Sequence, residues 1–134
     1  MSYATSMLRA DPRTFDYDDR TLLAGCIEAC LECSQACTAC AEACLSERDV
    51  AQLSDCIRIA LDCADVTGAT ARVLSRHPGY DANLRRALLA ACRAACALAA
   101  DQCERRAESF PHCRVCADAC RRCEAACSRL VESL

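Results

Sequence analysis

The sequence contains no lysine and no tryptophan, and it has only three glycines, three prolines, two phenylalanines and three tyrosines among its 134 residues. The scarcity of glycine and proline, together with almost no β-branched runs, argues against a strand-rich architecture and predicts an all-α fold. Because large side chains are rare, the core has to be built from small residues. This composition therefore implies helices that pack close together.

The charge pattern and the N-terminus exclude several kinds of partner. The net charge is −3 and the arginines are scattered, so we expect no nucleic-acid partner. Residues 1–15 lack the basic and apolar regions of a signal peptide, and no apolar run of roughly 18 residues could span a bilayer. We therefore expect no membrane partner and a cytoplasmic location, where thiols are kept reduced.

Sixteen cysteines are the most unusual feature of the chain. A chain of 134 residues can form a core without disulfides, so these cysteines are not needed as staples. In a reducing compartment they indicate metal ligands or redox groups. Six of them follow one another at intervals of 4, 3, 4, 3 and 4, which places them on one face of a helix. This first row consists of Cys26, Cys30, Cys33, Cys37, Cys40 and Cys44.

A second row near the C-terminus repeats the same pattern at intervals of 3, 4, 3 and 4. It consists of Cys113, Cys116, Cys120, Cys123 and Cys127. The segments between the two rows carry thiols more sparsely, at Cys56, Cys63, Cys92, Cys96 and Cys103. The sequence thus predicts two thiol-rich helices and two helices that carry thiols over only part of their length.

Turn and cap signals predict two units, an N-terminal arm or short helix over residues 1–17 and a bundle over residues 18–134. The four bundle helices are expected at about 18–47, 50–75, 81–108 and from 111 onward. Asp16 or Asp18 can cap the first of these helices and Asp49 the second, while Pro111 suits the first turn of the last. Long helices with short connections favour an antiparallel up-down-up-down four-helix bundle.

If consecutive helices run in opposite directions, the two ends of the bundle should contain different residues. One end should gather thiols from all four helices: Cys40, Cys44, Cys56, Cys63, Cys103, Cys113 and Cys116. His112 is adjacent to Cys113 and is predicted at this end. The opposite end should be closed by an apolar plug of Leu22, Leu23, Val73, Leu74, Leu84, Leu88, Leu130 and Leu134. On the second helix we expect Val66 and Thr70 to continue the core beyond its thiols, and Gly68 to permit close packing.

The spacing of the thiols restricts the metal that they could bind. Neighbours at i, i+3 or i, i+4 have Cβ atoms roughly 5 to 6 Å apart, so one helix can offer two sulfurs to one ion. Soft thiolates select Cu(I), zinc or iron–sulfur clusters. Zinc usually requires a tetrahedral site on loops or with histidine, and iron–sulfur clusters usually bind irregular backbone. Cu(I) accepts two or three thiolates, and bridging thiolates would allow about one Cu(I) per cysteine.

These rows resemble those of the copper storage proteins (Csp), a family of cysteine-rich four-helix bundles, in the branch without an export signal. The resemblance extends from about residue 18 to residue 134 and rests on the paired CxxxC rows of the first and last helices. It implies a homotetramer of bundles, each storing many Cu(I) ions, loaded through one open end and without a catalytic step. Since Cys63 is the last thiol of the second helix, we expect the fewest coppers beside the plug, where the start of the first row faces mainly the last helix.

Other interpretations remain open at the level of the sequence. The thiols could be a core of small apolar side chains, redox-sensing cysteines that form disulfides, or a sink for zinc and toxic soft metals. Catalysis by a nucleophilic cysteine would need a base held in position beside it. Because the chain has only two histidines for sixteen cysteines, this option is weak, and no enzyme is predicted. His112 is a candidate ligand at the entrance or a surface residue, and His77, Asp62 and Asp65 are expected to face solvent. A metallochaperone is a possible partner, and the helix surfaces show no clear apolar patch for an oligomer.

Overall fold

The structure is a computed structural model that describes residues 2–13, 15–76 and 81–134. Its elements are α1 (Tyr3–Ala10), α2 (Tyr17–Leu45), the 3₁₀ helix η1 (Val50–Leu53), α3 (Ser54–Ser75), α4 (Ala82–Arg106) and α5 (Pro111–Glu132). The described residues contain no β-strand, so the predicted all-α class is confirmed. None of these helices combines the length and the apolar composition needed to cross a bilayer. The predicted loop at Pro78 and Gly79, and His77, lie outside the described residues.

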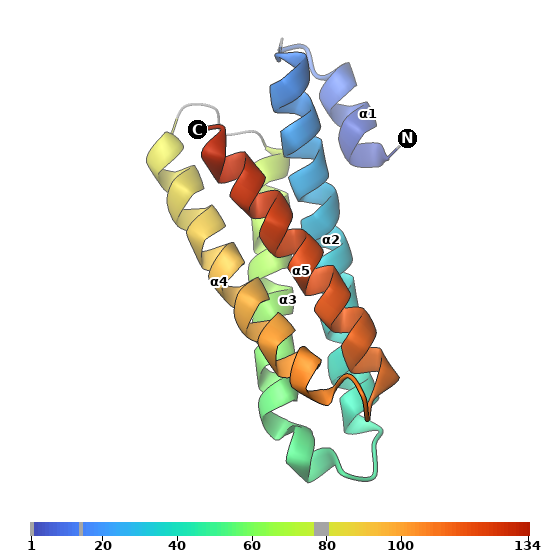
Figure 1. Cartoon of the computed structure of the whole chain (residues 1–134). Helices are drawn as coiled ribbons and strands as arrows, with labels where there is room; N and C mark the ends of the chain where they lie inside the picture. The colour runs from blue at the N-terminus through green and yellow to red at the C-terminus, as the bar shows by residue number, and fades with distance from the viewer. Residues whose placement is uncertain (1, 14, 77–80) are drawn as a thin grey trace.

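The four long helices lie side by side, and consecutive helices run in opposite directions (Figure 1). Helix α2 packs against α3 and α5, and α4 packs against the same two helices. The short helix α1 packs on the outside of α2. As a result, α2 and α4 begin at the end where α3 and α5 finish, and the opposite end holds the connections from α2 to α3 and from α4 to α5.

The helix boundaries follow the local sequence signals at α4 and α5. The Asp81 carboxylate caps α4 by accepting a 3.1 Å hydrogen bond from the backbone N–H of Leu84. Pro111 occupies the first turn of α5, where its missing N–H costs no helical hydrogen bond. Asp16 stands at the N-cap position of α2, although its side chain makes no capping hydrogen bond there.

The prediction that Asp49 caps the second bundle helix is wrong. Asp49 instead precedes η1, whose turn is closed by a 2.9 Å hydrogen bond from the backbone N–H of Gln52 to the carbonyl of Asp49. This turn places Leu53 in the interior, where it is fully buried. The gain from burying Leu53 accounts for the extra turn, and α3 consequently begins at Ser54 rather than near residue 50.

A layer of four leucines, one from each long helix, closes the end where α2 begins; we call it the leucine layer and this end the closed end. Its members are Leu23, Leu74, Leu89 and Leu130, none more than 2% exposed. The predicted plug residues Leu22, Val73, Leu88 and Leu134 flank the layer and are partly buried. Leu84 is 52% exposed, so its predicted place in the plug is wrong. The 3–4 spacing of α4 continues from Leu89 to Arg85, which turns Leu84 outward.

Helix α3 carries threonines at core positions beyond its last thiol. Thr67 and Thr70 are fully buried. Their hydroxyls donate 2.7 Å hydrogen bonds to the carbonyls of Cys63 and Val66 in the same helix, which satisfies their polar atoms. Thr67 rather than Val66 therefore occupies the core position at this level, a correction to the sequence prediction.

Gly68 allows α2 and α3 to approach closely, as predicted. A Cβ added at Gly68 would lie 3.2 Å from the Ser34 hydroxyl oxygen. That hydroxyl donates a 2.9 Å hydrogen bond to the carbonyl of Ala64, so it has little freedom to move away. The contact fixes the distance between the two helices that carry the middle of the thiol-lined core.

Candidate metal centre

All sixteen cysteines lie in the interior as free thiols. None of them is more than 2% exposed. Helix α2 supplies six, α5 five, α4 three and α3 two. Both rows that the 3–4 spacing assigns to one helix face are thus buried along their whole length. A core that would ordinarily contain branched aliphatic side chains contains sulfur instead.

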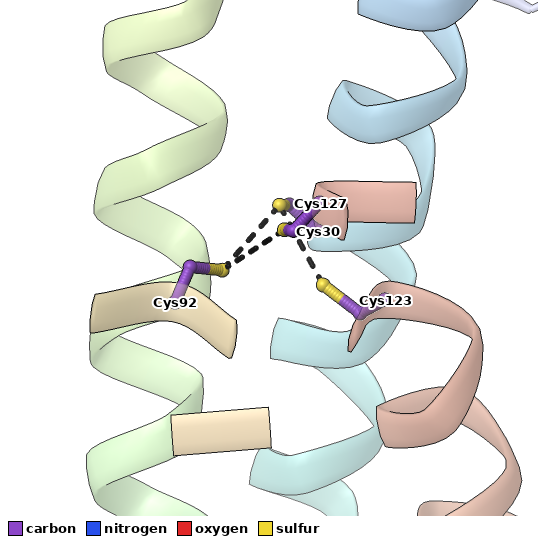
Figure 2. A group of neighbouring side chains, drawn as sticks. All are labelled: Cys30, Cys92, Cys123 and Cys127. Atoms are coloured by element: carbon purple, nitrogen blue, oxygen red, sulfur yellow. Dashed lines mark hydrogen bonds between the residues drawn. The ribbon is translucent and has the colours of Figure 1, made fainter. Parts of the chain in front are cut away.

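Four thiols from three helices form a group toward the closed end, which we call the closed-end group: Cys30, Cys92, Cys123 and Cys127 (Figure 2). The Cys30 sulfur lies 3.6 Å from that of Cys123 and 3.9 Å from that of Cys92, and the Cys127 sulfur lies 3.6 Å from that of Cys92. Cys26 is 3.7 Å from Cys127. This part of the α2 row was expected to face mainly the last helix; Cys26 and Cys30 do contact α5 thiols, and α4 adds Cys92 beside them.

A middle group consists of Cys33, Cys37, Cys63 and Cys120. The Cys37 and Cys120 sulfurs are 3.5 Å apart, and Cys33 lies 3.7 Å from Cys120 and 3.8 Å from Cys63. Cys96 of α4 lies 4.0 Å from Cys63, so all four long helices contribute at this level. Cys63 was expected among the thiols of the opposite end. It lies here because it is one heptad further than Cys56 from the connection between α2 and α3.

The end opposite the leucine layer combines thiols with an imidazole; we call it the open end. Its first group is Cys40, Cys44, His112 and Cys113, and its second is Cys40, Cys103 and Cys116, with ligand atoms within 4.8 Å of one another in each. Cys56, in the first turn of α3, is also buried at this end. Asp62 and Asp65 are both exposed on the outer face of α3, as predicted.

Neighbouring groups share members, which links the two ends. Cys123 belongs to the closed-end group and also lies within 4.8 Å of Cys33 and Cys96. Toward the open end, the Cys116 sulfur is 3.6 Å from that of Cys37. Sulfur atoms therefore follow one another along the core without a gap large enough to hold another layer of side chains.

His112 faces the open-end thiols with one ring nitrogen and the Glu47 carboxylate with the other. Its Nδ1 lies 3.6 Å from the sulfur of Cys40, 3.7 Å from that of Cys113 and 3.9 Å from that of Cys44. Its Nε2 lies 3.2 Å from the Glu47 carboxylate. Because a carboxylate only accepts hydrogen bonds, the contact with Glu47 places a proton on Nε2, and the tautomer that carries only this proton has an Nδ1 lone pair directed at the thiols.

The sequence reasoning missed Glu47. Its only local signal is its position three residues after Cys44, just beyond the last turn of α2. The His112 side chain is 22% exposed and that of Glu47 is 37% exposed, so the pair lies at the boundary between the thiols and solvent. The arrangement matches metal sites in which a carboxylate orients a histidine ligand from outside.

Interactions among the neighbouring thiols shift their pKa values in both directions. The bond with Cys127 is the main cause that lowers the pKa of Cys26 to about 5. The neighbouring Cys123 thiol, with burial added, raises the pKa of Cys96 above its ordinary value of 9.0. A sulfur that accepts S–H bonds is stabilised as a thiolate, whereas one that donates keeps its proton.

Arg85 brings a positive charge to the closed end. Its Nε is buried and has no hydrogen-bond partner among the described residues. Desolvation lowers the pKa of this guanidinium, and the charges of Cys26 and Asp19 act in the opposite direction. In return, the guanidinium contributes to the lowered pKa of Cys26. One cation thus lies near Cys26, the first thiol of the α2 row.

The chemistry of these groups is that of a soft-metal site. They offer three or four sulfurs, with one imidazole nitrogen at the open end, and no carboxylate belongs to any of the groups named above. Thiolates of this kind favour soft ions over the hard cations that prefer oxygen ligands. The fold and these groups together define a class, the helical proteins whose interior is lined by thiols for binding soft metals.

Comparison with known proteins narrows this class to a family. Residues 19–132 match the model of the copper storage protein (Csp) family, and the chain belongs to that family. The structure is similar to that of a copper storage protein, Ccsp, from Streptomyces lividans loaded with 10 copper equivalents (56% identity, 98% of this chain and 99% of that chain, TM-score 0.93). The family resemblance inferred from the cysteine rows is confirmed.

Two further relatives extend the comparison. A structure of a cytosolic copper storage protein from Streptomyces lividans with five coppers has 60% identity over 89% of this chain and 99% of that chain, with a TM-score of 0.86. An uncharacterised cysteine-rich protein of Bacillus subtilis, YhjQ, is 32% identical over 102 residues, which cover 76% of this chain and 89% of that protein.

Proposed function

We propose that the protein stores and sequesters many Cu(I) ions in the cytosol, bound by thiolates along the core of an up-down-up-down antiparallel four-helix bundle. The observation that carries this proposal is the set of sixteen buried free thiols, which adjoin one another from end to end. The copper-loaded Streptomyces lividans relatives support it. The bundle corresponds to residues 18–134, and residues 1–17 form the N-terminal arm.

The donor set favours Cu(I) over the alternatives. Cu(I) is a soft ion that is content with two or three thiolates, and sulfurs 3.5 to 4.0 Å apart on neighbouring helices can share one ion between them. Zinc would require four ligands in a tetrahedron at each site. With bridging thiolates, ligand counting gives about one Cu(I) per cysteine. We propose all sixteen cysteines as ligands: Cys26, Cys30, Cys33, Cys37, Cys40, Cys44, Cys56, Cys63, Cys92, Cys96, Cys103, Cys113, Cys116, Cys120, Cys123 and Cys127.

Copper enters and leaves at the open end in this proposal. The His112 Nδ1 lies within 4 Å of three thiols while its ring is partly exposed, so it can receive an ion from solvent and pass it inward. Glu47 keeps the ring turned in this direction. The leucine layer offers no ligand, and it closes the other end. Since storage needs only binding and release, no catalytic step is assigned to the protein.

The apo fold does not depend on copper. Neutral thiols are buried in the same way as small apolar side chains, and the leucine layer holds the four helices together at one end. Zinc fingers differ in this respect, because they are unfolded without metal. The protein can therefore be present in folded form before copper arrives. We further propose a homotetramer as the assembled state, with a metallochaperone as a copper donor.

An anaerobic titration of the fully reduced protein with Cu(I), against a competing chelator, tests the proposal. Storage requires saturation near the number of cysteines. Saturation at one to about four equivalents would reject storage and favour a thiol redox sensor. A matched titration with Zn(II) distinguishes the heavy-metal alternative, because bridged two-coordinate sites should hold several times more Cu(I) than Zn(II).

A further inference from the structure

The thiols of the open end are covered, although copper is proposed to enter there. None of these thiols is more than 2% exposed. Of the four ligands in the first open-end group, only His112 reaches solvent, with 22% of its side chain exposed. Its Nδ1 faces the thiols and its Nε2 faces Glu47. An ion from solvent therefore reaches a sulfur atom only after a side chain beside the imidazole has moved.

Two apolar side chains from the connections at this end belong to the core or pack against it. Leu53 of η1 is fully buried. Phe110, between α4 and α5, packs against the core and is only partly buried. Because part of Phe110 is already in solvent, turning it outward exposes less additional apolar surface than moving Leu53, and it costs less free energy. Phe110 is therefore the side chain that can uncover the thiols more readily.

The backbone of Phe110 is fixed by the residues on both sides of it. Pro111 disfavours helical geometry in the residue before it, and Phe110 accordingly has an extended backbone, with φ −132° and ψ 101°. Its N–H donates a 2.9 Å hydrogen bond to the carbonyl of Arg106, and its carbonyl accepts a 2.9 Å hydrogen bond from the N–H of Cys113. The movement open to Phe110 is thus a rotation of its side chain between rotamers, without opening of the whole connection.

The Phe110 ring lies beside the imidazole of His112. The centroids of the two rings are 5.8 Å apart, and their planes are tilted by 43°. The imidazole is thus held by Glu47 at Nε2 and flanked by an aromatic ring, while Nδ1 lies within 4 Å of three thiols. Rotation of Phe110 removes the flanking ring, and the hydrogen bond to Glu47 can persist during this movement.

We propose that Phe110 is the gate of the open end, and that Cu(I) passes beside His112 to the thiols when the Phe110 ring rotates outward. This inference rests on the proposed function and adds a step to it. Phe110 has no ligand atom, so it is a positioning residue that sets the rate of transfer and leaves the number of bound ions unchanged. The two neighbours have opposite effects, since loss of the imidazole slows loading whereas loss of the gate accelerates it.

Alkylation of the reduced apo protein by iodoacetamide tests the gate without copper. Phe110→Ala should react several-fold faster than wild type, and mass spectrometry should find the first modified thiols at the open end, among Cys40, Cys44 and Cys113. Phe110→Tyr keeps the ring and should react at the wild-type rate. The matched control is Phe15→Ala, because Phe15 is also partly buried and packs against the core, but precedes α2 at the closed end. Its loss should leave the rate unchanged.

The same variants separate the gate from copper storage. Phe110→Ala should load Cu(I), and release it to a chelator, several-fold faster than wild type with the same capacity. Phe110→Leu retains more apolar packing and should give an intermediate rate, and it serves the same test if the Ala variant does not fold.

Three results would overturn the gate. They are an alkylation rate of Phe110→Ala at or below that of wild type, first modification at the closed end, and an equal acceleration in Phe15→Ala, which would mean that lost stability alone exposes the thiols. A low Cu(I) capacity in the wild-type protein would instead reject storage, and the alkylation rates of the apo proteins would still decide whether Phe110 covers the thiols.

Discussion

The two ends of the bundle are built from different side chains. The closed end contains four buried leucines, whereas the open end contains His112, Glu47 and thiols at the border with solvent. Leucine packing stabilises the helices whether or not metal is present. The open end lacks such a layer, and its partly exposed His112 and Glu47 lie beside the thiols. The comparison shows that stability and access are assigned to separate ends of the same helices.

The thiol groups between these ends share features of both. Without copper they resemble the closed end, because neutral thiols bury like small apolar groups. With copper they become an anionic ligand array, because each bound ion displaces thiol protons. The interior can therefore change from apolar to ionic without exchanging one side chain for another. Five predictions separate the contributions of the two ends, from the largest expected effect to the smallest.

Alkaline pH should destabilise the apo protein most. Burial and hydrogen bonding raise the pKa of thiols such as Cys96 and Cys120 above the ordinary 9.0. Above about pH 9 the unfolded chain then binds fewer protons than the folded chain, so the stability present below this pH is lost as pH rises. Each such thiol costs up to about 1.4 kcal/mol per pH unit. Anaerobic urea unfolding between about pH 7 and pH 10.5 measures this loss, and a flat profile contradicts it.

Leu89→Ala should be the most damaging single change at the closed end. Leu89 is fully buried, so its truncation leaves a cavity and should lower the free energy of unfolding of the apo protein by about 2 to 5 kcal/mol. The control Leu84→Ala removes an exposed leucine of the same helix and should cost no more than about 0.5 kcal/mol. Equal effects in the two variants would mean that the leucine layer does not hold the closed end.

Removing one pair of thiols at either end should show that the Cu(I) capacity and the rate of Cu(I) loading depend on different thiols. Replacement of Cys30 and Cys123 by Ala at the closed end, or of Cys44 and Cys113 at the open end, should lower the Cu(I) capacity by about two ions in each case. Only the open-end pair should slow loading, because only those thiols adjoin His112. Titration gives the capacity and stopped-flow absorbance gives the rate. A closed-end variant with unchanged capacity would show that copper does not reach that group.

His112→Ala should slow both loading and chelator-driven removal of Cu(I) several-fold, with little change in capacity. The Nδ1 atom is lost, while all sixteen thiols remain. Arg114→Ala, at an exposed position two residues further along α5, is the control and should load at the wild-type rate. Unchanged rates for His112→Ala would show that the imidazole is a bystander.

Glu47→Ala should have the smallest effect, a slower loading rate than wild type but faster than His112→Ala. Glu47→Gln should remain close to wild type, since the amide oxygen still accepts the hydrogen bond from Nε2. The ¹⁵N shifts of the His112 ring report the tautomer directly. They should change in Glu47→Ala and remain in Glu47→Gln, and identical spectra in all three proteins would mean that Glu47 does not orient the ring.

Sequence reasoning succeeded where the signal is local. The 3–4 spacing of the cysteines is a property of one helix at a time, so the buried rows and the all-α class could be predicted from it. The proline at the start of α5 and the aspartate before α4 act within one turn, and they too were predictable. His112 was found because it adjoins Cys113 in sequence.

The misplacements concern how the helices lie relative to one another. The heights of Cys63 and Cys92 along the core depend on the lengths of the connections, including the unexpected η1 turn. Leu84 was misplaced because two adjacent residues compete for one buried position at a helix start. Glu47 is 65 residues from His112 along the chain, and no pattern within one helix brings such a pair together.

The length of the α2 row also bears on the order in which copper ions are bound and released. Cys26 and Cys44 are 18 residues apart, which corresponds to about 27 Å along a helix. With the route that we propose through the open end, an ion bound beside Cys26 has every other occupied position between itself and solvent. Such a store empties in the reverse of the order in which it fills. The copper available to a cell at a given moment is then the last that arrived, while the first remains in reserve.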